Sequence, residues 1–327
     1  MPILRGALIG CGYFGQIQLE AWRRMEGVEI VAACDQDRAK AQAAAPRAYT
    51  DAAELLRSEE LDFIDIATRP DTHLQLVRLA IERRIPAICQ KPMAPDLQSA
   101  TEMTSIAECS EVPVMIHENW RWQPWYREAL RRIRAGEIGK PVSYRFRHRQ
   151  RDGLGATPYP NQPYFKDMPR LLIYETLVHY IDTARFLFGD IAGVYARTRR
   201  KNPVIQGEDG ALILLDHAAG TAGVIDGNRY MNPEQPGPAM GEAWFEGDEN
   251  WIRIEGTGRL YLGADLVWEP ASTEGYKGDS VKATQQHFID CLRSGEPFET
   301  GTTAYLETFK AMEAAYRSSA TGERVAL

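Results

Sequence analysis

The first third of the chain alternates short apolar runs with segments of helical periodicity. The apolar runs have the character of strands buried on both faces of a parallel sheet, and they occupy residues 3–9, 28–34, 63–67, 87–89 and 114–117. Between them, apolar residues recur at helical spacing over residues 14–25, 52–58, 72–83 and 96–110, with Asp96 as the expected N-cap of the last helix. This alternation predicts an α/β domain built on a doubly wound parallel sheet.

Beyond residue 120 the alternation gives way to a long series of strands. We expect a helix over 124–135, a strand over 141–149, an apolar helix over 171–188, four to seven strands between 194 and 268, and closing helices over 281–293 and 302–320. The polar segment before the apolar helix contains Pro158, Pro160, Pro163 and Pro169, and its length suggests a loop that covers a site. The pattern predicts an α+β domain with an open, mainly antiparallel sheet.

Length and charge narrow the picture. A chain of 327 residues exceeds one ordinary domain, and we place a boundary between residues 122 and 123, giving domains 1–122 and 123–327. The net charge of -7 and the lack of a basic stripe argue against nucleic acid or a membrane as partner. The run of Arg197, Arg199, Arg200 and Lys201 is interpreted as a solvated strand end, with a polyanion site as the alternative.

The cysteines and the N-terminus bear on the compartment. The five cysteines (Cys11, Cys34, Cys89, Cys109 and Cys291) form no Cys-x-x-Cys pair and are expected to be reduced. A strand and a glycine loop by residue 10 leave no room for a signal peptide, and no apolar stretch has the length of a membrane span. We therefore expect the cytoplasm.

The sequence Gly10-Cys11-Gly12-Tyr13-Phe14-Gly15 follows the first predicted strand and opens the first predicted helix. In that context the three glycines serve a tight turn, close approach of a pyrophosphate, and close packing of helix on strand. Asp35 lies 20 residues after Gly15, where a carboxylate accepts hydrogen bonds from ribose hydroxyls and repels a 2'-phosphate. The motif predicts a dinucleotide site that prefers NAD to NADP, with a plain glycine turn as the alternative.

Polar residues follow the third and fourth long strands. Thr68 and Arg69 come after one, and Gln90 and Lys91 after the other. Ligands of open α/β sheets lie at the carboxyl ends of strands, so these four residues fall where the nicotinamide and its ribose would bind. On position alone, a lysine just past a strand is more often a solvated loop charge than a functional residue, so position by itself favours that interpretation of Lys91.

Glu175, His179 and Asp182 lie on one face of the apolar helix over 171–188. An imidazole suits the task of taking a hydroxyl proton during hydride transfer, a carboxylate one turn earlier would orient it, and Lys91 would stabilise alkoxide character on the substrate. A packed core histidine with a carboxylate partner is the alternative. Neither the histidines nor the cysteines have metal-ligand spacing, so we expect no metal site.

Five segments together resemble the glucose-fructose oxidoreductase, inositol dehydrogenase and MocA family over essentially the whole chain. They are GCGYFG at 10–15, IATRPDTH at 66–73, QKP at 90–92, ENWRWQP at 118–124 and ETLVHYID at 175–182. The resemblance implies an NAD(P)-dependent enzyme acting on sugars or polyols, whose C-terminal open sheet forms a homodimer or homotetramer. Residues 162–189 look like the aldose dehydrogenases of this family, including those acting on the branched pentose apiose.

The resemblance also implies roles for single residues. Lys91 matches the lysine of the family's E-K-P motif and His179 the histidine of its D-x-x-x-H motif, whereas Gln90 and Glu175 depart from the family's glutamate and aspartate. Trp122 is open to two interpretations, packing or stacking on a sugar. We assign the cofactor to Gly10, Gly12, Tyr13, Phe14, Gly15, Asp35, Gln36, Thr68, Arg69, His73, Gln90, Lys91 and Asn119. We assign the substrate to Lys91, Arg121, Trp122, Tyr164, Glu175 and His179, of which Lys91, Glu175 and His179 are catalytic.

The sequence therefore predicts a Rossmann domain that binds NAD and a second domain that binds a small sugar and forms the oligomer. Oxidation of an aldose hemiacetal to its lactone is the leading expectation. There are two alternatives, because a fold alone does not determine chemistry. The protein could oxidise a polyol or inositol, or it could be a dinucleotide sensor without catalytic activity.

Overall fold

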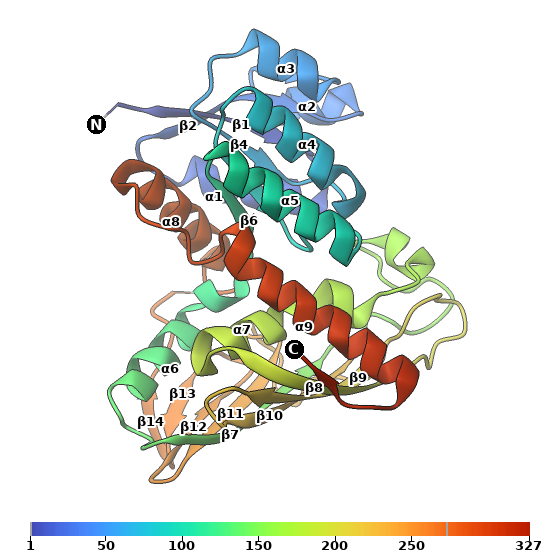
Figure 1. Ribbon diagram of the computed structural model, residues 1–327, viewed down its shortest axis with the longest axis vertical. Helices are drawn as coiled ribbons and strands as arrows, with labels where there is room; N and C mark the ends of the chain where they lie inside the picture. Colours follow the sequence, from blue (N-terminus) through green and yellow to red (C-terminus); the bar gives the residue numbers. More distant parts are fainter. Residues whose placement is uncertain (1, 273) are drawn as a thin grey trace. The chain divides into compact units, whose positions relative to one another are not determined.

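The computed structural model describes residues 2–272 and 274–327 and consists of two compact units (Figure 1). Unit 1 comprises Met1–Asn119 and Val281–Phe309, and unit 2 comprises Trp120–Ser280 and Lys310–Leu327. The sequence boundary at 122/123 thus falls close to the end of the N-terminal segment of unit 1. The segment Val281–Phe309 groups with unit 1, whereas the boundary alone assigned it to the second domain.

Unit 1 contains a six-stranded sheet in the order β3-β2-β1-β4-β5-β6, in which every pairing is parallel. The strands are β1 (Leu4–Ile9), β2 (Val28–Cys34), β3 (Arg47–Tyr49), β4 (Phe63–Ile66), β5 (Ala87–Gln90) and β6 (Val114–His117). This order is that of a doubly wound dinucleotide-binding sheet, with its topological switch between β1 and β4. The predicted parallel sheet is confirmed.

Five helices connect these consecutive strands: α1 (Tyr13–Arg23), α2 (Arg38–Ala44), α3 (Ala52–Ser58), α4 (Pro70–Glu82) and α5 (Leu97–Ser110). Helices α4 and α5 lie side by side (Figure 1). Asp96 caps α5, as expected, by accepting a hydrogen bond from the Ser99 amide. The periodicity missed α2 and β3, because an alanine-rich helix and a three-residue strand carry too few large apolar residues to show a period.

Helix α8 (Ser280–Ser294) joins unit 1 through its apolar face. Phe288 and Ile289 pack in one buried cluster with Trp22 of α1 and Phe63 of β4, and the rings of Phe63 and Phe288 meet edge-on at 5.7 Å. Gln285 donates a hydrogen bond to the carbonyl of Gln18. These contacts explain why a segment close to the C-terminus belongs to the N-terminal fold.

Unit 2 contains a nine-stranded sheet in the order β14-β13-β12-β11-β7-β10-β9-β8-β15. Its strands are β7 (Pro141–Arg149), β8 (Ile191–Arg199), β9 (Gly210–His217), β10 (Ala222–Asn228), β11 (Gly241–Gly247), β12 (Trp251–Ile254), β13 (Leu260–Leu262), β14 (Asp265–Trp268) and β15 (Val325–Ala326). Among the described residues every pairing is antiparallel except that of β7 with β10. The predicted open, mainly antiparallel sheet is confirmed.

Within the described residues, helices cover one face of this sheet only. Helix α7 (Val178–Phe188) and the end of α9 (Thr302–Thr321) lie on the same side of the sheet (Figure 1). Along β9, Ile213 and Leu215 are fully buried, whereas Leu212 and Leu214 are 43% and 41% exposed. The alternation therefore identifies an open face that carries apolar side chains.

The segment predicted as one α-helix over 171–188 is divided in the structure. Residues Leu172–Leu177 form a π-helix and α7 begins at Val178. The wider turn is invisible in the sequence because the apolar residues around it are compatible with either helix type. A π-turn within a helix is frequently found at functional sites.

The proline-containing segment before this helix is anchored to the body of unit 2. It contains a short 3-10 helix, Pro163–Asp167, and its Phe165 lies in a buried cluster with Tyr159 and Ile205. The Asn202 amide donates to the carbonyls of Gly153 and Gly155.

The part of the chain that the structure describes has no helix with both the length and the hydropathy needed to cross a membrane.

A buried carboxylate in β4 makes the stability of unit 1 depend on pH. Asp65 is fully buried and accepts hydrogen bonds from Trp22 Nε1 at 2.6 Å and from Gln18 Nε2 at 3.0 Å. Desolvation raises the pKa of this carboxyl from 3.8 to about 7. The folded protein then holds a proton that the unfolded chain has released, so the free energy of unfolding should fall as pH rises between these two values and level off above them.

Asp65→Asn mimics the protonated acid, and the Gln18 amide can rotate to accept a hydrogen bond from it. We expect this variant to lose the fall in stability across that pH range, as measured by urea unfolding at a series of pH values. An unchanged pH dependence in Asp65→Asn would show that the carboxyl does not titrate there.

Candidate active site

The glycine loop between β1 and α1 has the backbone geometry that a bound pyrophosphate requires. Gly10 has φ +97°, and a Cβ on it would lie 2.7 Å from the carbonyl carbon of Ala67. A Cβ on Gly15 would overlap the carbonyl oxygen of Gly10, so only glycine lets α1 come this close to the turn. A Cβ on Gly12 would meet nothing within 4 Å, which leaves the backbone open to a ligand.

Helix α1 begins at this loop without a side-chain cap. Gly12 occupies the N-cap position, and the first turn holds no acidic residue. The N–H groups and the dipole of such a helix end both favour an anion. Tyr13 is half exposed on the first turn, and the ring of Phe14 meets that of His117 edge-on at 6.2 Å. The residues present therefore fit the phosphates of a dinucleotide.

The Asp35 carboxylate is hydrogen-bonded to the glycine loop. Its Oδ2 accepts from the Cys11 amide at 2.8 Å, and its Oδ1 accepts from the Asp37 amide at 2.9 Å. Each oxygen keeps a further lone pair for a ribose hydroxyl. The structure thus brings together Gly10, Gly12, Gly15 and Asp35, whereas Gln36 is an exposed residue next to them.

Three of the predicted cofactor residues follow β4 closely, Thr68 and Arg69 in the loop and His73 in the first turn of α4. His73 is fully buried, and its Nε2 donates to the carbonyl of Thr68 at 3.1 Å. Desolvation lowers the pKa of His73 to about 4, so the ring is neutral at physiological pH. Arg69 is exposed and pairs with Asp71 at 3.7 Å. The buried His73 ring therefore holds the loop in place through its hydrogen bond to Thr68, and Thr68 and Arg69 are the more exposed residues of that loop.

Gln90 and Lys91 are both buried at the carboxyl end of β5, with exposed fractions of 5% and 8%. The Lys91 amide donates to Gln90 Oε1 at 2.6 Å, which fixes the glutamine side chain. Gln90 Nε2 makes no hydrogen bond to any residue that the structure describes. A buried donor of this kind fits an acceptor on a bound ligand. Asn119, 1% exposed, follows the neighbouring strand β6.

His179 lies on the first turn of α7 in unit 2 and is 6% exposed. Its ring stacks on that of Trp120 with centroids 4.4 Å apart and planes 15° apart. Tyr180 meets the same indole edge-on at 5.9 Å. The stack fixes the plane of the imidazole, which is a requirement for a base that must meet one particular proton.

Arg121 and Asp182 form a bidentate ion pair inside unit 2. Arg121 Nε and Nη2 each donate to one Asp182 oxygen at 2.7 Å, and the two residues are 7% and 0% exposed. Asp182 therefore binds Arg121 although it shares a helix face with His179. The guanidinium of Arg121 also lies 5.3 Å from the centre of the Phe186 ring.

Glu175 lies within the π-helix, and its side chain is partly exposed. Its amide donates to the carbonyl of Leu171 at 2.8 Å. The carboxylate thus belongs to the wider turn that immediately precedes α7 and His179. Its orientation depends on where that turn begins.

The last two predicted substrate residues lie in different surroundings. The guanidinium of Arg127 covers one face of Trp122 at 3.4 Å and also lies 4.6 Å from Phe186. Trp122 therefore uses that face for packing. Tyr164 is 44% exposed, and its hydroxyl accepts a hydrogen bond from Gln162 Nε2 at 3.0 Å.

The sequence did not identify Trp120 as the partner of His179 or Arg121 as the partner of Asp182. The available signal was the tryptophan-rich segment ENWRWQP, in which aromatic and cationic residues adjoin the end of β6.

Within the described residues no group of three or more His, Cys, Asp or Glu side chains is arranged to hold a metal ion.

Comparison with known proteins shows which family this site belongs to. Residues 4–118 match the oxidoreductase family with an NAD-binding Rossmann fold, and residues 126–259 match the GFO/IDH/MocA C-terminal domain. The D-apiose dehydrogenase of Rhizobium rhizogenes is 37% identical over 99% of this chain and 98% of its own. That of Paraburkholderia graminis is 37% identical over 99% of this chain and 89% of its own.

A solved structure is similar over the same extent. The crystal structure of an oxidoreductase from Agrobacterium radiobacter in complex with NAD+, L-tartaric acid and magnesium has a TM-score of 0.91 and 36% identity, covering 99% of this chain and 98% of that one. The resemblance that the sequence motifs carry is confirmed, as are the expected oxidoreductase class and NAD as the cofactor.

The Arg121–Asp182 pair should be necessary for the stability of unit 2. Arg121→Met leaves a buried carboxylate without its partner, so we expect a loss of about 3–5 kcal/mol in the free energy of unfolding, measured with urea. Arg259→Met removes an exposed pair with Glu269 in the same unit and serves as the control, with little change expected. Equal effects of the two variants would contradict the importance given to the buried pair.

Proposed function

The chain belongs to the Gfo/Idh/MocA family of NAD-binding oxidoreductases, and on this premise we propose that it is a sugar dehydrogenase that oxidises an aldose to its lactone. A pentose such as apiose is the first candidate substrate. The alternatives are oxidation of a polyol or inositol, and a dinucleotide sensor without turnover.

The observation that carries this proposal is the full-length similarity to two D-apiose dehydrogenases, at 37% identity, together with the presence of Lys91 and His179. A sensor would not need a cationic side chain at the end of β5 or an imidazole fixed on Trp120. Both features support catalysis.

Oxidation of a ring hemiacetal removes a hydride from carbon and a proton from its hydroxyl group. Bound NAD supplies the hydride acceptor. We assign the proton to His179, whose ring the Trp120 stack holds in one plane. Lys91 supplies positive charge where the substrate oxygen develops alkoxide character, and Glu175 orients His179 or holds a substrate hydroxyl.

We also assign the finer roles from the fold. The cofactor contacts are Gly10, Gly12, Gly15, Asp35 and the residues that follow β4 and β5. Arg121 belongs to the substrate site and is held there by its ion pair with Asp182. Trp122 and Tyr164 are the aromatic residues of the substrate site. The segment 123–327 supplies most of the substrate side.

The protein is proposed to be cytoplasmic and to form a homodimer or homotetramer through the open face of the second sheet. Leu212 and Leu214 of β9 and Trp251 of β12 are exposed apolar side chains on that sheet. Exposed apolar residues in such numbers support burial against another copy. The net charge of -7 gives no support to nucleic acid as a partner.

The function is tested by incubating purified protein and NAD with a panel of pentoses, hexoses, polyols and sugar acids while reduced nicotinamide is measured. We expect turnover with an aldose. Turnover with polyols alone would move the assignment to polyol oxidation, and NAD binding without turnover on any member would favour a sensor.

Asp35 should determine the choice between NAD and NADP. Its carboxylate, fixed to the Cys11 amide, would repel a 2'-phosphate, so we expect kcat/KM to be higher with NAD. Replacing Asp35 by Ser and Gln36 by Arg should shift the preference towards NADP, because repulsion is removed and a phosphate partner is added. Unchanged preference in this double variant would mean that the adenosine ribose binds elsewhere.

His179→Ala should lower kcat by roughly 10²- to 10⁴-fold, the usual contribution of a positioned general base, and should leave NAD affinity nearly unchanged. A rise of kcat/KM with pH, the mark of a general base, should be present in the wild type and absent in the variant. Glu175→Gln should reduce turnover less. Wild-type turnover in His179→Ala would assign His179 to packing and make Lys91 the candidate base.

A further inference from the structure

The N-terminal end of the π-helix is held by a residue from a distant loop. Glu208, between β8 and β9, is 7% exposed. Its Oε2 accepts from the Leu171 amide at 3.2 Å, its Oε1 from the Ile173 amide at 2.9 Å, and its backbone carbonyl from the Leu172 amide at 3.3 Å. One glutamate thus satisfies three successive N–H groups that begin a helix and have no partner within it.

Tyr316 of α9 satisfies the fourth N–H group. Its hydroxyl accepts from the Tyr174 amide at 3.1 Å and donates to Glu208 Oε1 at 2.6 Å. Burial and then the charge of Glu208 raise the pKa of the Tyr316 phenol, so the hydroxyl keeps its proton and remains a donor. The first amide of this segment that bonds within the segment is that of Glu175, to the carbonyl of Leu171.

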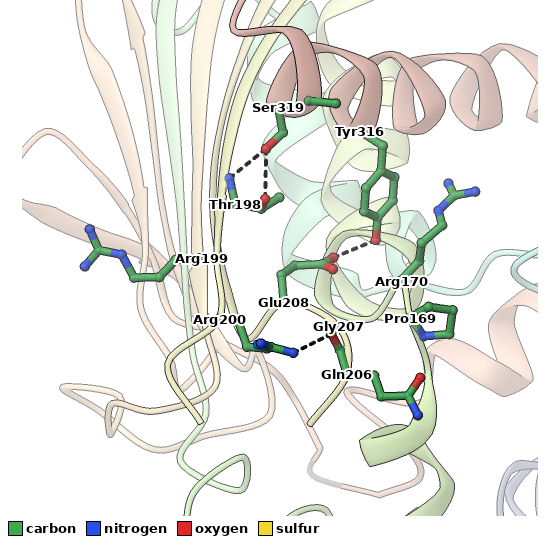
Figure 2. Close-up of a pocket in the computed structure, with 11 residues that line it drawn as sticks. Pro169, Arg170, Thr198, Arg199, Arg200, Gln206, Gly207, Glu208, Tyr316 and Ser319 are labelled. Carbon is green, nitrogen blue, oxygen red and sulfur yellow. Dashed lines mark hydrogen bonds between the residues drawn. The ribbon is translucent and has the colours of Figure 1, made fainter. Parts of the chain in front are cut away.

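The surroundings of these two residues hold them in place. The guanidinium of Arg170 lies 4.2 Å from the centre of the Tyr316 ring and pairs with Glu313 at 2.7 Å. Glu208 and Tyr316 point towards each other (Figure 2), and with Ser319 of α9 they line a pocket of about 360 Å³. Ser319 bonds Thr198 of β8 instead.

We propose that Glu208 and Tyr316 are positioning residues for the dehydrogenase reaction, because together they fix where the π-helix begins and therefore how Glu175 is presented beside His179. A helix that began one residue earlier or later would rotate Glu175 away from its present direction. The negative charge of Glu208 also stabilises the positive end of the helix dipole. The inference rests on the proposed function through the roles given to Glu175 and His179.

Two variants weaken the hydrogen bonds that Glu208 and Tyr316 make to the start of the π-helix, in different ways. Glu208→Gln replaces one of the two acceptor oxygens by an amide NH2 group, a donor that faces a backbone N–H donor. Tyr316→Phe removes both the donor to Glu208 and the acceptor of the Tyr174 amide. We expect each to lower kcat by about 10- to 100-fold, the usual effect of a small displacement of catalytic groups, with the affinity for NAD unchanged. The pH dependence of kcat/KM should shift with it, because Glu175 would no longer act on His179 as in the wild type.

The control is Ser319→Ala, which changes the same pocket and touches none of the four amides; its kcat and pH profile should equal those of the wild type. The decisive measurement is a double-mutant cycle: in a Glu175→Gln background, Glu208→Gln should cost far less kcat than in the wild type, since its effect passes through Glu175. Circular dichroism and thermal unfolding establish that each variant is folded. Should Glu208→Gln not fold, the same cycle is run with Tyr316→Phe.

Equal losses of kcat in both backgrounds, or wild-type kcat and pH profile in both single variants, would overturn the positioning role. The proposed function fails separately, when His179→Ala retains turnover or no sugar is oxidised. A protein in which His179→Ala is inactive and the Glu208 and Tyr316 variants are fully active refutes only the present inference.

Discussion

The buried ion pair of Arg121 and Asp182 is the interaction on which the candidate site in unit 2 depends. It joins residues 61 positions apart by two hydrogen bonds of 2.7 Å, and Asp182 has no exposure to solvent. Because a buried carboxylate is costly unless its partner is present, helix α7 and the segment before α6 (Pro124–Arg134) are fixed together. That arrangement stacks Trp120 on His179 and leaves the imidazole in one plane.

The fold could be predicted where apolar periodicity is strong. The long parallel strands of unit 1 are continuous apolar runs, and the strand Pro141–Arg149 alternates apolar and polar side chains. The short elements α2 and β3 do not, and the placement of α8 depends on contacts between Phe288 and Phe63, which no local pattern encodes. The π-turn differs from an α-helix by its i→i−5 hydrogen bonds, and its first amides bond to Glu208 and Tyr316, which come from distant segments.

For the candidate site, local motifs predicted what is formed locally. The glycine loop and Asp35 could be predicted because they require only a strand, a turn and a helix in succession. In the structure, the Cys11 amide of that loop donates a hydrogen bond to the Asp35 carboxylate. Spacing alone could not show that Asp182, and not Glu175 or His179, is the residue of this helix face that pairs with Arg121. The reason is that Arg121 lies in another segment of the chain. The aromatic residues have divided roles as well, since Arg127 takes one face of Trp122 while Trp120 takes His179.

The most direct measurement of the central claim identifies the product. Wild-type protein is incubated with NAD and apiose. The amount and identity of the sugar product, measured by nuclear magnetic resonance, are compared with the amount of reduced nicotinamide formed. The account predicts one equivalent of the aldonolactone, or of the aldonate from its hydrolysis, for each equivalent of reduced nicotinamide, and none from His179→Ala. A ketose product, or equal product from His179→Ala, would contradict it.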